Sequence, residues 1–392
     1  MRFGVNYTPR VGWFHSWLDL DLGLVAEDMA AIAELGLDHV RIFPLWPLLQ
    51  PNRTLIRTRA VDDVLAVVDA AAAVGLTVTV DALQGHLSSF DFLPSWVTTW
   101  HQRNLFTDPE VVSGQRALVR TLAAELAKHA GAEGLSLGNE FIQFAAQRHP
   151  GRSELSSAQA GAWLETLLAE ARSAWPEAVL THSYDDDLWF DDTHPFEPVH
   201  AVSLGDQTTV HSWVFMQVGP RYGRRHPALH LFARYLVELA RAWGGPGRPI
   251  WLQEVGAPAT WVEAADAPDF VHQTIASLVE AATGPVPELE GITWWCSHDV
   301  DRELADFPGL EHSLGLFAAD GALKPVGRAL QEAVAQVRQG SGGGAVGRDC
   351  FALPSASPRR RSLSGPKSEL FDQWLRQAAA GEPPALRIPD LK

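Results

Sequence analysis

The stretch LSLGNEFIQ (135–143) begins like a buried strand and then stops on Asn139 and Glu140, an amide and a carboxylate side by side. A second stretch, RPIWLQEVGAP (248–258), repeats this pattern and carries Glu254 near its end. Burying such polar groups without partners is unfavourable. The two stretches therefore indicate strands whose ends form the floor of a pocket.

Around these two stretches, short β-rich runs alternate with amphipathic Ala/Leu-rich helical runs, which favours a parallel sheet with crossover helices. Several of the helical runs end in Gly before the next strand, as expected of a helix stop. The spacing of about 40 residues per unit fits a (β/α)₈ TIM barrel, an α/β fold. The eight predicted strands are residues 2–7, 38–43, 76–83, 134–140, 178–184, 208–213, 249–255 and 291–297.

The predicted barrel occupies residues 1–338 and closes with a final helix in ALKPVGRALQEAVAQVRQG. Between the fifth and sixth strands, residues 185–207 are expected to form a long irregular loop. Residues 339–392 are rich in Gly, Pro, Arg and Ser, which predicts a flexible linker and a tail that can be disordered. Within this tail, SELFDQWLRQAAAG can form a short amphipathic helix.

Composition limits the partners and the compartment. The net charge of −16 argues against nucleic acid or an anionic membrane as the main partner. We see no signal peptide at the N-terminus and no apolar stretch long enough to span a bilayer. Two cysteines build no disulfide framework, which favours a reducing cytoplasm. The fifteen Trp residues are unusual, because Trp stacks on sugar rings as well as filling cores.

Polar and aromatic residues gather at the predicted carboxyl ends of the strands, the face on which TIM-barrel enzymes work. Singly, each has an ordinary structural explanation. A lone His is often a satisfied buried group, and neighbouring Trp residues on a strand must point opposite ways, so one faces the helices. The set is Asn6, Tyr7, Arg41, His86, Asn139, Glu140, Tyr184, His211, Trp213, Glu254, Trp294, Trp295, His298 and Asp299.

The two glutamates on the fourth and seventh strands make a functional explanation the better one. Cleavage of a glycosidic bond needs two carboxyl groups that flank the bond, one protonated and one ionised. Strands four and seven face each other across the barrel mouth, so Glu140 and Glu254 can share one sugar. A bulge or bend is expected to aim both Asn139 and Glu140 at the ligand. This chemistry requires no metal and no organic cofactor.

With these residues placed, the sequence resembles glycoside hydrolase family 5, in the clan of retaining (β/α)₈ glycosidases. The resemblance is carried by GNE, QE, VRI and WW on the predicted strands and by GH just after the third strand, and it covers about residues 1–335. Longer stretches, such as GVNYTPRVGWFHSW, RIFPLWPLLQPNRT and TWWCSHDVD, are similar to a bacterial subfamily of β-mannosidases that release mannose from Man-β1,4-GlcNAc. The partner it implies is a small β-mannoside oligosaccharide.

The resemblance implies a role for each matching position. Glu140 would be the acid/base and Glu254 the nucleophile, with Arg41 lowering the pKa of Glu254. Trp213 stands where the family has a Tyr, which leaves its role open between a donor to the nucleophile and a sugar contact. The remaining predicted substrate-binding residues are Asn6, His86, Asn139, His211, Trp294, Trp295 and Asp299, with Trp46 and Trp96 as candidate contacts to a second sugar.

Three alternatives stay open at this point. One is a metal-dependent barrel hydrolase using His86, His182, His211, His298 and Asp299, although the first strand lacks the paired His typical of such sites. Another is a non-catalytic carbohydrate-binding barrel, which would not need both glutamates. The third keeps the same chemistry with another specificity, as an endo-β-mannanase or a β-glucosidase.

Overall fold

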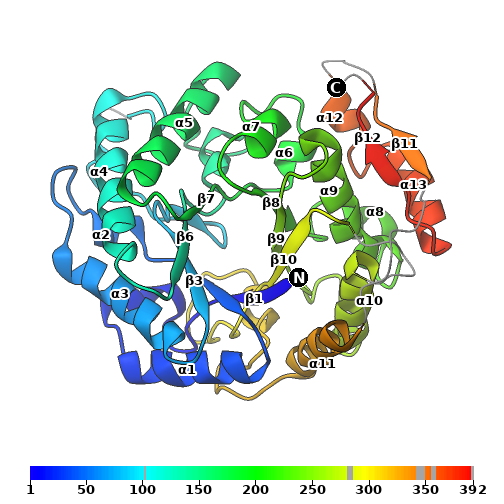
Figure 1. Cartoon of the computed structure of the whole chain (residues 1–392), viewed down its shortest axis with the longest axis horizontal. Helices are drawn as coiled ribbons and strands as arrows, with labels where there is room; N and C mark the ends of the chain where they lie inside the picture. Colours follow the sequence, from blue (N-terminus) through cyan, green and yellow to red (C-terminus); the bar gives the residue numbers. More distant parts are fainter. Residues whose placement is uncertain (101–102, 280–285, 341–348, 355–358, 390–392) are drawn as a thin grey trace.

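The strands of one eight-stranded sheet form a ring at the centre of the molecule (Figure 1). The structure is a computed structural model that describes residues 1–100, 103–279, 286–340, 349–354 and 359–389. The strands pair in the order β7-β6-β3-β2-β1-β10-β9-β8, and every neighbouring pair is parallel. They are β1 (Arg2–Asn6), β2 (His39–Ile42), β3 (Thr77–Asp81), β6 (Ala132–Ser136), β7 (Val179–Thr181), β8 (Thr208–Ser212), β9 (Ile250–Val255) and β10 (Leu289–Trp294).

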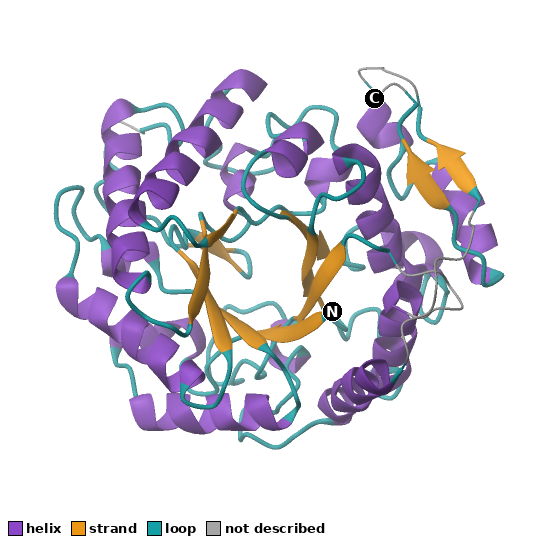
Figure 2. Ribbon diagram, viewed as in Figure 1, coloured by secondary structure: helices purple, strands orange, loops and turns teal. Residues whose placement is uncertain are grey.

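The ends of this order, β7 and β8, are linked by a side chain. The Thr209 hydroxyl donates a hydrogen bond to the His182 carbonyl oxygen over 2.6 Å, and both groups are buried. The ring is therefore nearly closed, as Figure 2 shows. This architecture confirms the predicted (β/α)₈ barrel.

The helices surround the ring and cover its outer face (Figure 2). Their inner sides carry apolar residues at helical spacing, as in α4, where Val111, Leu118 and Leu122 are fully buried. Among the described residues no helix is both long and apolar enough to cross a membrane. The longer helices are α1 (Leu22–Glu34), α3 (Thr58–Ala72), α4 (Pro109–Leu126), α5 (Ser157–Ala174), α9 (Ala228–Gly244), α10 (Ala267–Val279) and the predicted last helix α11 (Pro325–Gln339).

Short elements follow the strands at the rim of the barrel. The region 185–207, expected to be an irregular loop, contains two short helices, α6 (Asp187–Phe190) and α7 (Pro198–Ser203). Pro198 begins α7, where its missing N–H removes no helical hydrogen bond. The other short elements are η1 (Trp13–Leu18), α2 (Trp46–Leu49), β4 (His86–Leu87), β5 (Phe90–Asp91), η2 (Phe141–Ala145), α8 (Val218–Tyr222) and η4 (Glu311–Ser313).

The C-terminal segment differs from the expected disordered tail where it is described. It forms β11 (Cys350–Ala352), α12 (Arg360–Leu363), α13 (Glu369–Ala379) and β12 (Ala385–Arg387), and β11 pairs with β12. The predicted amphipathic helix is α13. Its buried Phe371 and Trp374 contact Tyr235 of α9, with ring centroids 4.7 Å and 5.0 Å apart. Residues 341–348 of the predicted linker lie outside the described residues.

One residue of this segment joins it to the rim of the barrel. Arg361 donates hydrogen bonds of 3.0 Å to the carbonyl oxygens of Asp192, His194 and Phe196, in the region between α6 and α7. The tail folds because its apolar stripe has α9 to pack on, and composition alone does not reveal that partner.

Candidate active site

A pocket of about 460 Å³ lies at the carboxyl ends of the strands. Six of the sequence-predicted residues line it: His86, Asn139, Glu140, Trp213, Glu254 and Trp295. Three others lie directly beneath this lining, because Asn6, Arg41 and His211 are fully buried and contact the residues above them. The barrel therefore brings together nine predicted residues from distant parts of the chain.

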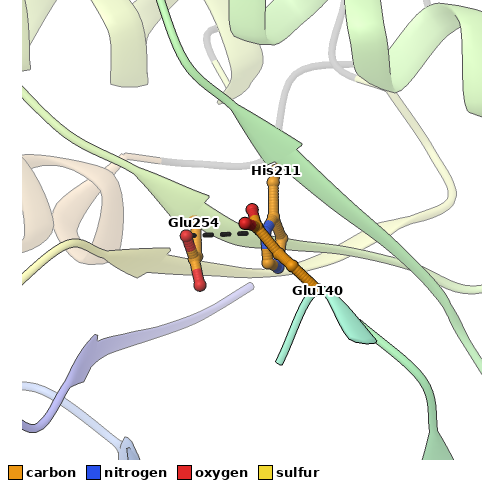
Figure 3. A group of neighbouring side chains, drawn as sticks. All are labelled: Glu140, His211 and Glu254. Carbon is orange, nitrogen blue, oxygen red and sulfur yellow. Dashed lines mark hydrogen bonds and ion pairs between the residues drawn. The ribbon is translucent and has the colours of Figure 1, made fainter. Parts of the chain in front are cut away.

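Glu140 and Glu254 face each other across the floor of the pocket, with His211 between them (Figure 3). One carboxylate oxygen from each glutamate and a ring nitrogen of His211 all lie within 4.8 Å of one another. His211 Nδ1 is 2.7 Å from Glu140 Oε1 and 3.4 Å from Glu254 Oε2. Two carboxyl groups this close to each other can flank a single sugar.

The backbone explains how two neighbouring polar residues both reach the ligand side. Strand β6 ends at Ser136, so Glu140 lies beyond the strand rather than on it. Glu140 adopts a left-handed backbone, with φ 41° and ψ 32°, and precedes η2. Gly138 is needed for this turn, because a Cβ there would lie 2.5 Å from the Leu83 carbonyl oxygen. The predicted bulge or bend is therefore a bend, made by the left-handed backbone of Glu140.

Arg41 is the cation beneath the pocket floor. Its guanidinium pairs with Asp81 over 2.7 Å and with Glu254 Oε1 over 2.9 Å, and all three side chains are at least 97% buried. It also donates to the side-chain oxygens of Asn6 and Asn139. The planar guanidinium of Arg41 thus fixes the positions of Glu254 and Asn139 relative to each other.

Asn6 acts below the floor rather than at the sugar. Its side-chain amide donates to the carbonyl oxygens of Gln253 and Trp294, over 3.0 Å and 3.2 Å. It therefore ties β1 to β9 and β10 just beneath Glu254, which corrects its prediction as a substrate contact.

Trp213 occupies the position at which the resemblance leads us to expect Tyr. Its indole N–H donates to Glu254 Oε2 over 3.1 Å. The indole also lines the pocket, so the two roles left open by the sequence coincide in one side chain. Glu254 consequently accepts from Arg41 through one oxygen and from Trp213 through the other.

The pKa of Glu140 is raised to about 8, first by burial and then by the nearby charge of Asp185. The pKa of His211 is lowered, chiefly by burial, so its ring is neutral. Its Nε2 faces the Gln253 side-chain carbonyl at 3.0 Å, and a carbonyl can only accept, which places the ring hydrogen on Nε2. The bare Nδ1 then accepts from Glu140, which must be protonated to donate.

The pKa of Glu254 differs from the expectation of a depressed value. It is raised above its ordinary range, chiefly by burial, which the guanidinium of Arg41 does not offset. The resemblance leads us to expect the cation beneath Glu254, which favours the ionised carboxylate. It does not reveal how deeply the carboxylate is buried, and burial disfavours the ionised form.

Four predicted sugar contacts lie outside the pocket lining, which corrects their assignment. Trp294 points away from the pocket to Phe270 of α10, with ring centroids 6.3 Å apart, while its neighbour Trp295 lines the pocket. Trp46 and Trp96 pack edge to face in the core, and both indoles donate to Gln50. Asp299 pairs with Lys324 over 2.7 Å.

Sequence reasoning missed several polar residues of the pocket. Arg148 pairs with Asp185 and Asp187 over 2.8 Å each, and Arg148 and Asp185 line the pocket near Glu140. Glu311 and Ser88 line it from loops after β10 and β3. All of these lie in loops or at the start of short helices, where no periodic pattern marks them. Their only signal was the length and the polar and aromatic content of those loops.

The residues of the metal-dependent alternative do not gather in one place. Among the described residues, only Glu140–His211–Glu254 and Asp185–Asp186–Asp187 bring three possible ligand side chains together. His298 instead stacks on Phe317 with ring centroids 5.0 Å apart. His182 is fully buried beside Trp163 and Tyr184.

Solved structures similar to this one identify its relatives. A glutamate-to-alanine variant of GH5_18 from Streptomyces cattleya, in complex with Manb1-4GlcNAc, is 49% identical with a TM-score of 0.95. The match covers 99% of this chain and 94% of that one. GH5_18 from Bifidobacterium longum subsp. infantis is 47% identical with a TM-score of 0.94, over 99% of this chain and 92% of that one.

A more distant structure shares the fold alone. The exo-beta-1,4-mannosidase Op5Man5 from Opitutaceae bacterium strain TAV5 is 22% identical with a TM-score of 0.80, and the match covers 100% of this chain and 70% of that one. No protein-family model matches the sequence, and no curated protein matches it either.

A (β/α)₈ barrel with two facing glutamates at its carboxyl rim, and with these neighbours, is a glycoside hydrolase. Within that class the chain belongs to GH5_18, subfamily 18 of glycoside hydrolase family 5. Two of its solved relatives were captured with Manb1-4GlcNAc.

Proposed function

We propose that the chain is a retaining, exo-acting β-mannosidase that hydrolyses the terminal β-1,4-linked mannose of Man-β1,4-GlcNAc. The observation that carries the proposal is the pair Glu140 and Glu254, whose oxygens lie within 4.8 Å across one pocket. The disaccharide bound to relatives of 44–49% identity supports the choice of substrate.

In this proposal Glu254 attacks the anomeric carbon while Glu140 gives its proton to the leaving oxygen. Arg41 and Trp213 hold the two oxygens of Glu254, so the carboxylate keeps one orientation during attack. Forming the ester removes the negative charge of Glu254, which lowers the pKa of Glu140. Glu140 then takes a proton from water, and the released mannose keeps its configuration. The scheme needs neither a metal nor an organic cofactor.

Asn139, His86 and Trp295 are the proposed contacts of the sugar held at Glu254. Asn139 is oriented by Arg41 and by the His86 carbonyl oxygen, to which its amide donates over 3.2 Å. An amide beside the acid suits the sugar 2-hydroxyl, a contact that strengthens in the transition state. Trp295 presents its ring to the same pocket as the platform for the sugar.

Exo action is supported by a cluster of aromatic rings, three of which are chain neighbours of the pocket-lining residues Ser89, Asp91 and Pro308. Phe14 of η1 contacts Phe92 and Phe307 with ring centroids 4.6 Å and 5.2 Å apart, and Phe90 lies 4.9 Å from Phe307. These rings come from three loops that are far apart in the sequence. In the proposal these rings close one end of the cleft, so that only a terminal sugar enters it.

We further propose residues 1–338 as the catalytic domain, with 339–392 as an appended segment, and a cytoplasmic location. The two cysteines are free in the structure, Cys296 buried and Cys350 exposed, which suits a reducing compartment.

Side-by-side assays test the proposed specificity. Man-β1,4-GlcNAc, manno-oligosaccharides and nitrophenyl β-mannoside, β-glucoside and β-galactoside are offered at equal concentration, and kcat/KM is measured for each. We expect the disaccharide to be preferred and mannose to be released singly from non-reducing ends. Preference for internal bonds of long manno-oligosaccharides would make the chain an endo-β-mannanase, and preference for the glucoside a β-glucosidase.

Trp213 offers a separate test of how the nucleophile is held. Replacing Trp213 with Phe keeps an aromatic ring but removes the donor to Glu254 Oε2. A hydrogen bond to a charged group contributes about 1.5–3 kcal/mol, so kcat/KM is expected to fall about 10- to 100-fold. The matched control is Trp261→Phe, in a surface pocket away from the site. An unchanged kcat/KM in Trp213→Phe would mean that the indole only lines the pocket and that its hydrogen bond to Glu254 does not contribute to catalysis.

A further inference from the structure

Glu311 is a third buried glutamate in the pocket, and the catalytic scheme does not use it. It begins η4 in the loop after β10, and only 6% of its surface is exposed. It nevertheless lines the same pocket as Glu140 and Glu254. Among the described residues no cation forms an ion pair with it, although a buried charge is normally paired.

Two buried oxygens of this pocket, Glu311 Oε2 and Ser88 Oγ, make no hydrogen bond of ordinary geometry to the described protein, although the Ser88 side chain is near enough to Glu311 to act on its pKa. Buried polar atoms are nearly always hydrogen-bonded, so an unpartnered pair that lines a pocket indicates a ligand. Ser88 also has a left-handed backbone, with φ 50°, which is unfavourable for a non-glycine residue. Both features point to a surface shaped for a polar ligand rather than for stability.

The groups around Glu311 place it on one side of the pocket. Its pKa is raised to about 7, first by burial and also by the charges of Glu254 and, more weakly, Glu140. The side chains of Ser88 and Trp295 lower it. The pKa of Glu140, by contrast, responds to Asp185 and Arg148. Geometry places Glu311 near the Glu254 side: Glu311 lines the pocket together with Trp295, and the Trp295 ring lies 6.2 Å from Trp213, the donor to Glu254.

We propose that Glu311, together with Ser88, binds a hydroxyl of the terminal sugar held at Glu254 and so selects for a non-reducing end. The inference rests on the proposed function. Asn139 is assigned to the 2-hydroxyl, so Glu311 takes the 3-, 4- or 6-hydroxyl. A sugar hydroxyl both donates and accepts, and it satisfies Glu311 Oε2 and Ser88 Oγ at once. A further sugar linked at that hydroxyl would have to displace the contact.

The test compares Glu311→Ala and Glu311→Gln with wild type on nitrophenyl β-mannoside and its 3-, 4- and 6-deoxy analogues. The control is Glu303→Ala, an exposed carboxylate in the same loop. We expect kcat/KM on the parent mannoside to fall about 10- to 100-fold in Glu311→Ala, as for loss of a hydrogen bond to a charged group. One deoxy analogue should lose a similar factor in wild type and nothing further in Glu311→Ala.

A stability measurement separates binding from a structural role. Since Glu311 Oε2 makes no hydrogen bond of ordinary geometry within the protein, Glu311→Gln, which keeps the size of the side chain, should leave the thermal midpoint unchanged. A lower midpoint with equal losses on all four substrates would assign Glu311 to the structure and overturn the inference. So would a kcat/KM within twofold of wild type in both variants. A wild-type chain inactive on the parent mannoside would overturn the proposed function as well, which distinguishes the two failures.

Discussion

Replacing Glu254 with Ala is expected to lower kcat on nitrophenyl β-mannoside by at least about 10⁴-fold, the scale seen when a covalent nucleophile is removed. The reason is geometric. Glu254 is the carboxylate held by Arg41 and Trp213 at the pocket floor, and no other carboxylate of the pocket has both contacts. The substitution leaves a space beside the anomeric carbon that a small anion can enter.

Azide or formate should restore turnover in Glu254→Ala, and azide should form the inverted glycosyl azide, because it attacks from the vacated side. Product configuration is read by nuclear magnetic resonance. Glu290→Ala, an exposed carboxylate on β10, serves as the control and should retain full activity. If azide gives the retained product instead, Glu254 is not the nucleophile and the assignment of the two glutamates must be reversed.

Replacing Glu140 with Ala is expected to reduce kcat/KM on Man-β1,4-GlcNAc by about 10²- to 10⁴-fold, the range for general acid–base catalysis. The loss should be far smaller for ester formation from a mannoside with a nitrophenolate leaving group, which departs without a proton. The ester then accumulates, because no base activates water. Azide should accelerate its breakdown and, attacking the ester, give the retained glycosyl azide.

The pH profile provides the second readout for Glu140. Its pKa is about 8, and the acid form is the active one, so kcat/KM of wild type should fall as pH rises through about 8. Glu254 must be ionised to attack, and its pKa is raised, so activity should also fall at acidic pH, starting at a higher pH than for an ordinary glutamate. Glu140→Ala should lose the alkaline fall on the nitrophenyl substrate. An alkaline limb that persists unchanged would assign it to another group.

The architecture and the two glutamates were predictable because their signals are local. Strand and helix periodicities lie within single segments, so the eight strands and α11 follow from the pattern of residues. Glu140 and Glu254 stand out for the same reason, since a carboxylate closes an otherwise apolar run in each case. The alternation of strand side chains predicts that one of Trp294 and Trp295 faces the helices, but it does not tell which one.

The rest depends on which segments meet in space. Trp46 and Trp96 look like sugar contacts until α2 and the loop after β3 bury them against each other. Glu311 and Ser88 lie more than two hundred residues apart and meet only because two loops fold over the same rim.

The sequence by itself determined a (β/α)₈ barrel with one glutamate near the end of each of two facing strands, because periodicity and strand ends are properties of short segments. Tertiary structure alone decided the left-handed turn at Glu140, the raised pKa of Glu254, the folded tail on α9 and the third carboxyl at Glu311. Each of these depends on burial and on charges contributed by distant loops, which no single segment contains.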